Sequence, residues 1–127
     1  MNDNPYKGTF DAEIAGETYS LRPSFDALIE FEELTGVSAN VACERLGKGE
    51  LSAKIIVGAI WAGIQGEAFA RNDKSYCPGY RVIGELIRRD GMAKALKVAI
   101  KVLMYGIIPH DEVCRIEEGA KTESKKQ

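Results

Sequence analysis

The sequence predicts an α+β fold, mostly helical, in which an N-terminal β-hairpin packs on four to five α-helices. Apolar residues alternate with polar ones over residues 8–22, recur at helical spacing over residues 24–105, and make up 45% of the 127-residue chain. This content is enough for one core. We therefore expect one domain over residues 1–108. A polar and mobile C-terminal tail should follow over residues 109–127, which hold too few apolar side chains to order themselves.

The alternation in residues 8–22 predicts two antiparallel strands. Phe10, Ala12 and Ile14 fall on one face, and Tyr19 and Leu21 resume the pattern after a short connection. That connection contains a glycine, which tight hairpin turns favour. A proline follows the second strand and ends it, because proline cannot donate a hydrogen bond to the ladder.

Serine and glycine mark the first two helices after the hairpin. Ser24 can cap the first helix, and Gly36 ends it. The apolar residues that keep helical spacing in this helix include Phe25, Leu28, Ile29 and Leu34. Ser38 can cap a short second helix that runs to about Leu46.

The third helix begins after Ser52 and is apolar on most sides, so we expect it at the centre of the core. Its main stripe consists of Ile55, Ile56, Ala59, Ile60 and Ile64. Val57 and Trp61 lie off that stripe. A polar connector rich in turn residues follows over residues 66–80.

Two further helices are expected after the connector. The fourth begins at about Tyr80, and the fifth runs from about Met92 to Tyr105. The fourth helix carries Val82, Ile83, Leu86 and Ile87 on one face, and the fifth places Lys94, Lys97 and Lys101 opposite its apolar face. That lysine stripe is typical of the solvated side of an amphipathic helix, and Pro109 should end regular structure.

The stretch from Leu28 to Glu50 resembles a DNA-binding helix-turn-helix at first sight, but its spacing argues against that function. Such a motif needs a small residue where this chain has Glu32, and its second helix would bury Ala42 and Arg45. The apolar residues of that helix are instead Val41 and Leu46. Several carboxylates flank the turn and would repel phosphates. A helix-turn-helix regulator therefore stays only as an alternative, and we expect no specific nucleic-acid binding.

Composition excludes several broad classes of protein. The net charge is −2, no apolar run is long enough for a membrane span, and the N-terminus does not have the pattern of a signal peptide. The three scattered cysteines, Cys43, Cys77 and Cys114, favour a reducing cytoplasm over a disulfide framework. The N-terminal part is acidic and residues 81–101 are basic, an asymmetry that could orient a partner or a second copy.

Catalytic and metal-binding chemistry is not indicated. The one histidine, His110, has helical spacing to Cys114, but two further zinc ligands are missing. The short GxxG stretch from Gly63 to Gly66 ends an apolar helix and lacks the basic neighbours of a phosphate-binding loop. We therefore expect no enzyme activity, no cofactor and no metal, and we expect a small binding or assembly module.

Four short patterns occur in order between Lys7 and Glu67. They are a Gly-x-x-Tyr-x-Leu return (Gly16, Tyr19, Leu21), a helix ending in Glu-x-x-Thr-Gly (Glu32, Thr35, Gly36), a glycine loop with serine (Gly47, Gly49, Ser52) and a Gly-x-x-Gly helix end (Gly63, Gly66). In this order the stretch resembles the small tail proteins of gene transfer agents and related prophages of alphaproteobacteria. Family members are described both as tail tube components and as tail assembly chaperones.

The resemblance implies a role in building a long bacteriophage tail, without catalysis. A tube subunit closes a ring through extended sheets, whereas this chain has one hairpin followed by helices. The helical content favours a tail assembly chaperone that binds a tube-type or tape-measure-type tail protein in the host cytoplasm during virion assembly. A structural tail tube component is the alternative.

Four aromatic residues are the candidate partner-binding residues: Trp61, Phe69, Tyr76 and Tyr80. Trp61 lies off the main stripe of the third helix, and the other three cluster in or beside the connector. Aromatic side chains beside a mobile loop are typical of transient interfaces. The alternative is that all four complete the core.

Overall fold

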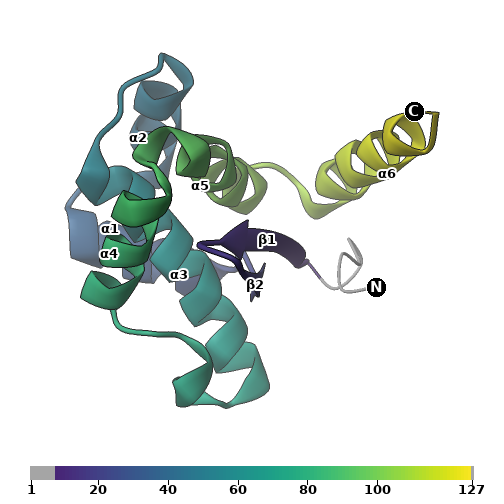
Figure 1. Cartoon of the computed structure of the whole chain (residues 1–127). Coiled ribbons are helices and arrows are strands. Elements are labelled where there is room, and N and C mark those ends of the chain that lie inside the picture. The colour runs from purple at the N-terminus through teal and green to yellow at the C-terminus, as the bar shows by residue number, and fades with distance from the viewer. Residues whose placement is uncertain (1–7, 127) are drawn as a thin grey trace.

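The computed structural model describes the backbone of residues 8–126 and the side chains of residues 8–119. Its elements in chain order are β1 (Phe10–Ile14), β2 (Glu17–Leu21), α1 (Phe25–Thr35), α2 (Ala39–Gly47), α3 (Ala53–Arg71), the 3₁₀ turn η2 (Lys74–Tyr76), α4 (Tyr80–Asp90), α5 (Met92–Ile107) and α6 (His110–Lys126). Figure 1 shows the hairpin, α1, α4 and α5 arranged around α3, with α2 beside α5 and α6 to one side. The predicted α+β, mostly helical fold is confirmed.

The hairpin forms as its sequence pattern predicts. The two strands pair antiparallel, with Ile14 opposite Glu17, so only two residues form the turn. Those residues, Ala15 and Gly16, both have positive φ, which is the geometry of a type I′ turn. The alternating residues Phe10, Ile14, Tyr19 and Leu21 are all buried against the helices.

Helix α1 has the predicted caps but a different buried face. The hydroxyl of Ser24 accepts a hydrogen bond from the Ala27 amide, and Gly36 ends the helix with φ of 72°. The buried side chains are Ala27, Phe31 and Thr35, whereas Phe25 is 74% exposed and Ile29 is also exposed. The expectation that Phe25 and Ile29 share the apolar stripe of α1 is wrong. Helix α1 approaches α3 closely at Gly66, so the small side chain of Ala27 faces α3 there and these two residues face solvent.

The corner between α1 and α2 is a packed helix connection. Glu32 accepts a hydrogen bond from the amide of Ala39 at 2.9 Å, so the residue that breaks the helix-turn-helix pattern caps the second helix. Helix α2 buries Ala42 and Leu46. Val41 is 46% exposed, which corrects the expectation that the apolar residues of this helix are its buried ones.

Helix α3 is the centre of the core, as predicted, and contacts α1, α4, α5 and β2. It is longer than predicted, because residues 66–71 belong to the helix and not to the connector. The side chains of Glu67 and Arg71, one turn apart, form an ion pair at 2.7 Å that suits a helical conformation. Asn72 then ends the helix with φ of 53°.

The glycines of the GxxG stretch let the hairpin approach α3. The amide of Arg22 donates to the carbonyl oxygen of Gly63 at 2.9 Å. A Cβ at Gly66 would overlap the carbonyl oxygen of Arg22, so only glycine fits there. This stretch is therefore a helix–hairpin contact, and it offers no open loop to a phosphate.

Helices α4 and α5 meet at Gly91, where φ is 110°. Helix α4 buries Ile83 and Ile87, while Val82 is exposed, so the predicted apolar face is narrower in the structure. On α5 the expected solvated lysine stripe is wrong at Lys101. Its ammonium group lies 4.4 Å from the centre of the Phe10 ring and 3.0 Å from Glu117.

The expectation that regular structure ends at Pro109 is wrong, because α6 follows it directly. Figure 1 shows α6 to one side of the other helices, beyond α5 and β1. Val113, Cys114 and Glu117 lie on one face of α6 and are buried. Glu117 pairs with Lys101 and also hydrogen-bonds to Tyr105. These few residues dock α6 on the rest of the protein. The low apolar content of the segment does not reveal this tertiary contact.

Candidate functional site

Side chains along one stripe of α3 form the floor of a groove. From Lys54 to Phe69 the positions that line it recur about every three to four residues, the spacing that keeps side chains on one side of a helix. The members of this stripe are Lys54, Val57, Trp61, Gln65, Ala68 and Phe69. About fifteen residues at about 1.5 Å each give a floor about 22 Å long. We call this the α3 groove, and it consists of two hollows.

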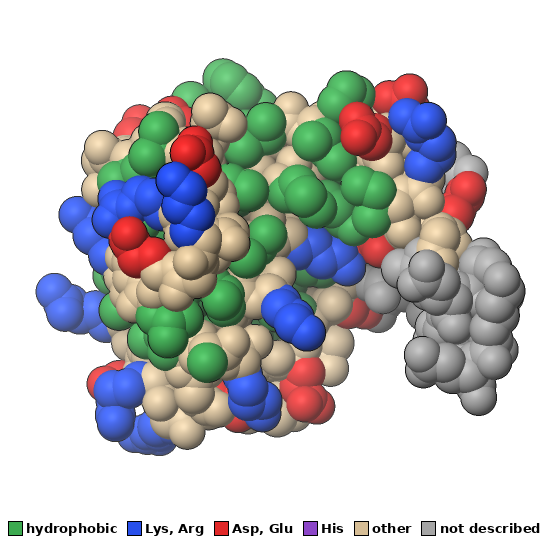
Figure 2. Space-filling view, turned by 90° about the horizontal axis from the view of Figure 1, so that it is seen from above, with side chains coloured by type: hydrophobic (Ala, Val, Ile, Leu, Met, Phe, Trp, Pro, Cys, Tyr) green, Lys and Arg blue, Asp and Glu red, His purple; other side chains and the backbone are tan. Residues whose placement is uncertain are grey.

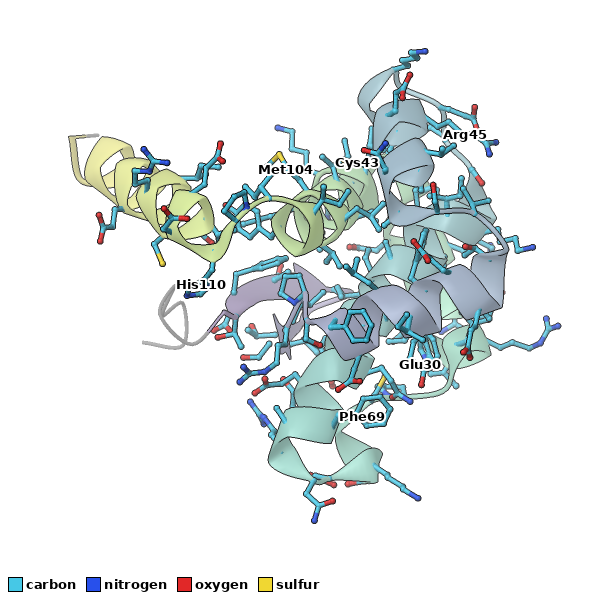
Figure 3. The ribbon with its side chains drawn as sticks, turned by 180° about the vertical axis from the view of Figure 1, so that it is seen from behind. Glu30, Cys43, Arg45, Phe69, Met104 and His110 are labelled. Atoms are coloured by element: carbon cyan, nitrogen blue, oxygen red, sulfur yellow. The ribbon has the colours of Figure 1, made fainter. Side chains whose placement is uncertain are left out.

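The first hollow of the α3 groove has a volume of about 340 Å³. The C-terminal half of α3, η2 and the start of α4 surround it. Its lining includes Trp61, Phe69 and Tyr80, three of the four aromatic residues predicted to bind a partner. Phe69 is 45% exposed, and Figure 3 labels it on α3 below Glu30 of α1. Because α3 extends to Arg71, Phe69 belongs to the helix, and the helix fixes the position of its backbone.

The wall of the first hollow is held in place by contacts between the connector and α3. The rings of Trp61 and Tyr80 meet edge to face, with centroids 6.2 Å apart. The thiol of Cys77 lies 3.8 Å from the carbonyl oxygen of Trp61. Burial raises the pKa of Cys77 to about 12, so this thiol stays protonated at neutral pH and is a poor nucleophile.

The second hollow has a volume of about 650 Å³ and shares Tyr80 with the first. It lies between α1, the start of α3, and α4. Its apolar lining residues are Leu34, Ala53, Val57, Tyr80, Gly84 and Met92. Its charged lining residues are Lys54, Arg81, Glu85 and Arg88. Together the two hollows make a long apolar surface bordered by mostly basic side chains.

Tyr76, the fourth predicted residue, does not line either hollow. Its hydroxyl accepts a hydrogen bond from the amide of Ser20 at 2.6 Å, and its ring meets Tyr19 edge to face. The guanidinium of Arg71 stacks 4.0 Å from the centre of the same ring. Tyr76 therefore packs the connector against the hairpin, and we do not include it in the groove.

Lys54 and Arg81 were not predicted from the sequence as site residues. The sequence signal that could have identified them was that each lies close to a residue the sequence analysis singled out. Lys54 lies one helical turn before Val57, and Arg81 follows Tyr80 directly. The sequence placed Val57 off the main stripe, but the structure buries it in the core at 4% exposure. The sequence could not show that α1 and α4 leave the groove-lining stripe of α3 partly uncovered.

Potential metal ligands are scattered over the described part of the chain. Among the described side chains no three histidine, cysteine or acidic residues lie together as metal ligands, and none of the three cysteines forms a disulfide. His110 and Cys114 lie 3.7 Å apart, as their helical spacing predicts. Figure 2 shows apolar patches among side chains of both charges on the face seen from above. None of the helices from residue 8 to residue 126 has the length and apolar character to cross a bilayer.

Comparison with known protein families gives a match over the first part of the chain. Residues 7–77 match the family described as phage tail tube protein, GTA-gp10, and this range covers the hairpin, α1, α2, α3 and η2. No curated protein and no solved structure matches the chain. The matched residues include most of the α3 groove and make up more than half of the sequence. The chain therefore belongs to this phage tail protein family of gene transfer agents.

Proposed function

We propose that the protein is a tail assembly chaperone, which binds a tail component before or during tail polymerisation and acts without catalysis. The observation that carries this proposal is the α3 groove. It presents Trp61, Phe69 and Tyr80 along an apolar floor about 22 Å long. A groove of this length fits a helical or extended segment of an unassembled subunit.

The first hollow is suited to reversible capture. Aromatic side chains bury a large apolar area at low cost in side-chain entropy, which makes them frequent hot spots of interfaces. The connector that forms one wall is held by the Trp61–Tyr80 ring contact and by the hydrogen bond from Ser20 to Tyr76, so the hollow is formed before a partner arrives. A site formed in advance loses less entropy on binding.

The partner in this proposal is a tail protein of the tube or tape-measure type. We place the binding step in the cytoplasm of the host bacterium, where tail subunits are made and must stay unpolymerised until they are used. The net charge of −2 agrees with a protein partner, because nucleic-acid binding draws most of its affinity from a surplus of lysine and arginine.

A structural tail tube component is the second candidate, and the name of the family, phage tail tube protein, favours it. Against it stands the strand content. In the described residues the sheet has two strands, and they pair with each other within one chain. A subunit that builds a tube wall needs extended sheets to continue from one subunit to the next. We therefore prefer the chaperone.

The two candidates differ in where the protein is found after assembly. Purified tails or whole particles should be analysed by quantitative mass spectrometry, beside a lysate that contains assembly intermediates. A chaperone is abundant with the intermediates and absent from finished tails. A tube component is present in finished tails at a copy number that matches the repeat of the tube, and that result would reject the chaperone.

A further inference from the structure

We propose that the exposed face of α1 of one copy docks in the second hollow of the α3 groove of another copy, so that the protein associates head to tail with itself. Both surfaces are present on every chain, each is apolar, and their charges are opposite. The proposal goes beyond the chaperone function, because capture of a tail component does not require it.

The first surface is the solvent side of α1. Phe25 is 74% exposed and Ile29, one turn later, is also exposed. At about 100° per residue, Glu33 continues this side of the helix, one further turn along. Asp26 lies beside Phe25 and is exposed as well. The surface is therefore a short apolar ridge with carboxylates along it, which a second apolar surface of opposite charge could cover.

The second surface is the hollow between α1, α3 and α4. Its floor contains Val57 and Met92, and its volume of about 650 Å³ has room for the side chains of a helical ridge. Arg88 is already paired with Glu85 at 3.1 Å. Lys54 and Arg81 are exposed, and neither forms a salt bridge among the side chains described. Their charge is opposite to that of Asp26 and Glu33 on the ridge.

The ridge cannot enter the hollow of its own chain. Leu34 of α1 lines that hollow, so one side of α1 already forms part of its wall. Phe25 and Ile29 lie about 180° and about 140° around the helix from Leu34, at roughly 100° per residue. They therefore point away from the hollow, and the complementary surface must come from a second molecule.

The resulting contact is heterologous, because it joins two different surfaces. In a pair of copies, one keeps a free hollow and the other keeps a free ridge. Because the ridge points away from the hollow of its own chain, further copies add to these free surfaces, and the contact generates a closed ring or an open filament. The second hollow is part of the α3 groove assigned to tail-partner binding and shares Tyr80 with the first hollow, so self-association and capture of a tail component would compete.

Charge reversal combined with mixing tests the proposal. The full-length protein, Glu33→Lys and Arg81→Glu are studied by sedimentation velocity from about 10 µM to about 1 mM, a range that includes weak contacts. The mass of the wild-type protein should rise with concentration beyond that of a dimer. Each variant alone places like charges together and should associate at least about tenfold more weakly.

An equal mixture of the two variants should regain the association. The basic ridge of Glu33→Lys then meets the acidic hollow of Arg81→Glu, so opposite charges face each other with their signs exchanged. The ridge of Arg81→Glu and the hollow of Glu33→Lys keep their native charges and also attract each other. Recovery in the mixture therefore separates a contact between these two surfaces from a general effect of either substitution.

Lys97→Glu is the matched control, because Lys97 is exposed on α5 and does not line the hollow. It should associate as the wild type does, and circular dichroism should show all variants folded. Wild-type protein that stays monomeric at every concentration would overturn the proposal. So would single variants that associate normally, or a mixture that gains nothing over its components. The test uses no tail protein, so its failure leaves the chaperone function untouched.

Discussion

Nε of Arg22 lies 2.9 Å from Oε1 of Glu67, and this ion pair joins the residue after the hairpin to the last part of α3. The other oxygen of Glu67 binds Arg71 at 2.7 Å. Glu67 is buried, and both arginines are partly exposed. The carboxylate is thus the centre of a short network that holds β2 against the helix that carries the groove.

We expect Glu67→Ala to lower the free energy of unfolding by about 2 kcal/mol. Removing one partner of a buried ion pair costs about 3–5 kcal/mol, and the partial exposure of the arginines reduces that figure. Urea denaturation measures the change. Glu44→Ala, which breaks the exposed pair with Lys48, is the control and should cost no more than about 0.5 kcal/mol. Equal effects of the two substitutions would show that the network does not stabilise the hairpin contact.

We expect Gly66→Ala to destabilise the protein although alanine favours helices. A Cβ at this position would overlap the carbonyl oxygen of Arg22, and backbone cannot move aside as a flexible side chain can. The loss should be about 2 kcal/mol, within the range for overpacking. Gly47→Ala is the control, because nothing lies within 4 Å of a Cβ there. It should be neutral or stabilise slightly, and thermal melting distinguishes the two outcomes.

We expect Tyr76→Phe to destabilise the protein by about 1 kcal/mol, because the amide of Ser20 loses its acceptor at 2.6 Å. Tyr80→Phe is the matched control, because the contact that Tyr80 makes with Trp61 is between the rings. Chemical denaturation of both variants measures the difference. If Tyr76→Phe is as stable as the wild type, the hydrogen bond does not contribute to the packing of the connector.

The sequence was sufficient to predict the local features of the fold. The alternation around the two-residue turn and the serine and glycine caps of α1 are local signals, and the structure has these features where the sequence placed them. The exposure of Phe25 was not predictable, because it depends on the close approach of α1 to Gly66 of a distant helix. Helix α6 was missed for a similar reason, since its docking depends on the pair of Glu117 with Lys101.

The candidate site was predictable in part. The offset of Trp61 from the core stripe indicated a side chain available for other contacts, and Trp61 lines the first hollow. Tyr76 and Tyr80 are similar in the sequence, both aromatic and both near the connector. Only the tertiary structure separates them, because it places one on the hairpin and the other in the groove.

We expect stability to fall at alkaline pH because of Cys77. Burial raises the pKa of its thiol from 9.0 to about 12. Between these values the unfolded thiol ionises and the folded one does not, so a rise in pH favours the unfolded state. One titrating group can change the free energy of unfolding by at most about 1.4 kcal/mol per pH unit, and the partial exposure of this thiol makes the expected loss smaller. Urea denaturation from about pH 8 to about pH 11 measures this dependence. Cys77→Ala should show a shallower dependence, and an unchanged slope would contradict the assignment to this thiol.

The central claim is that the α3 groove binds a tail component, and Phe69→Ser tests it most directly. Phe69 is 45% exposed in the groove, and Val41, on α2 outside the groove, is 46% exposed. Tagged wild type, Phe69→Ser and Val41→Ser are co-expressed with the tube-type and tape-measure-type tail proteins, and the captured partner is quantified. We predict equal melting temperatures for the three proteins, capture at least about tenfold lower for Phe69→Ser, and unchanged capture for Val41→Ser. Capture by Phe69→Ser equal to that of the wild type would contradict the claim.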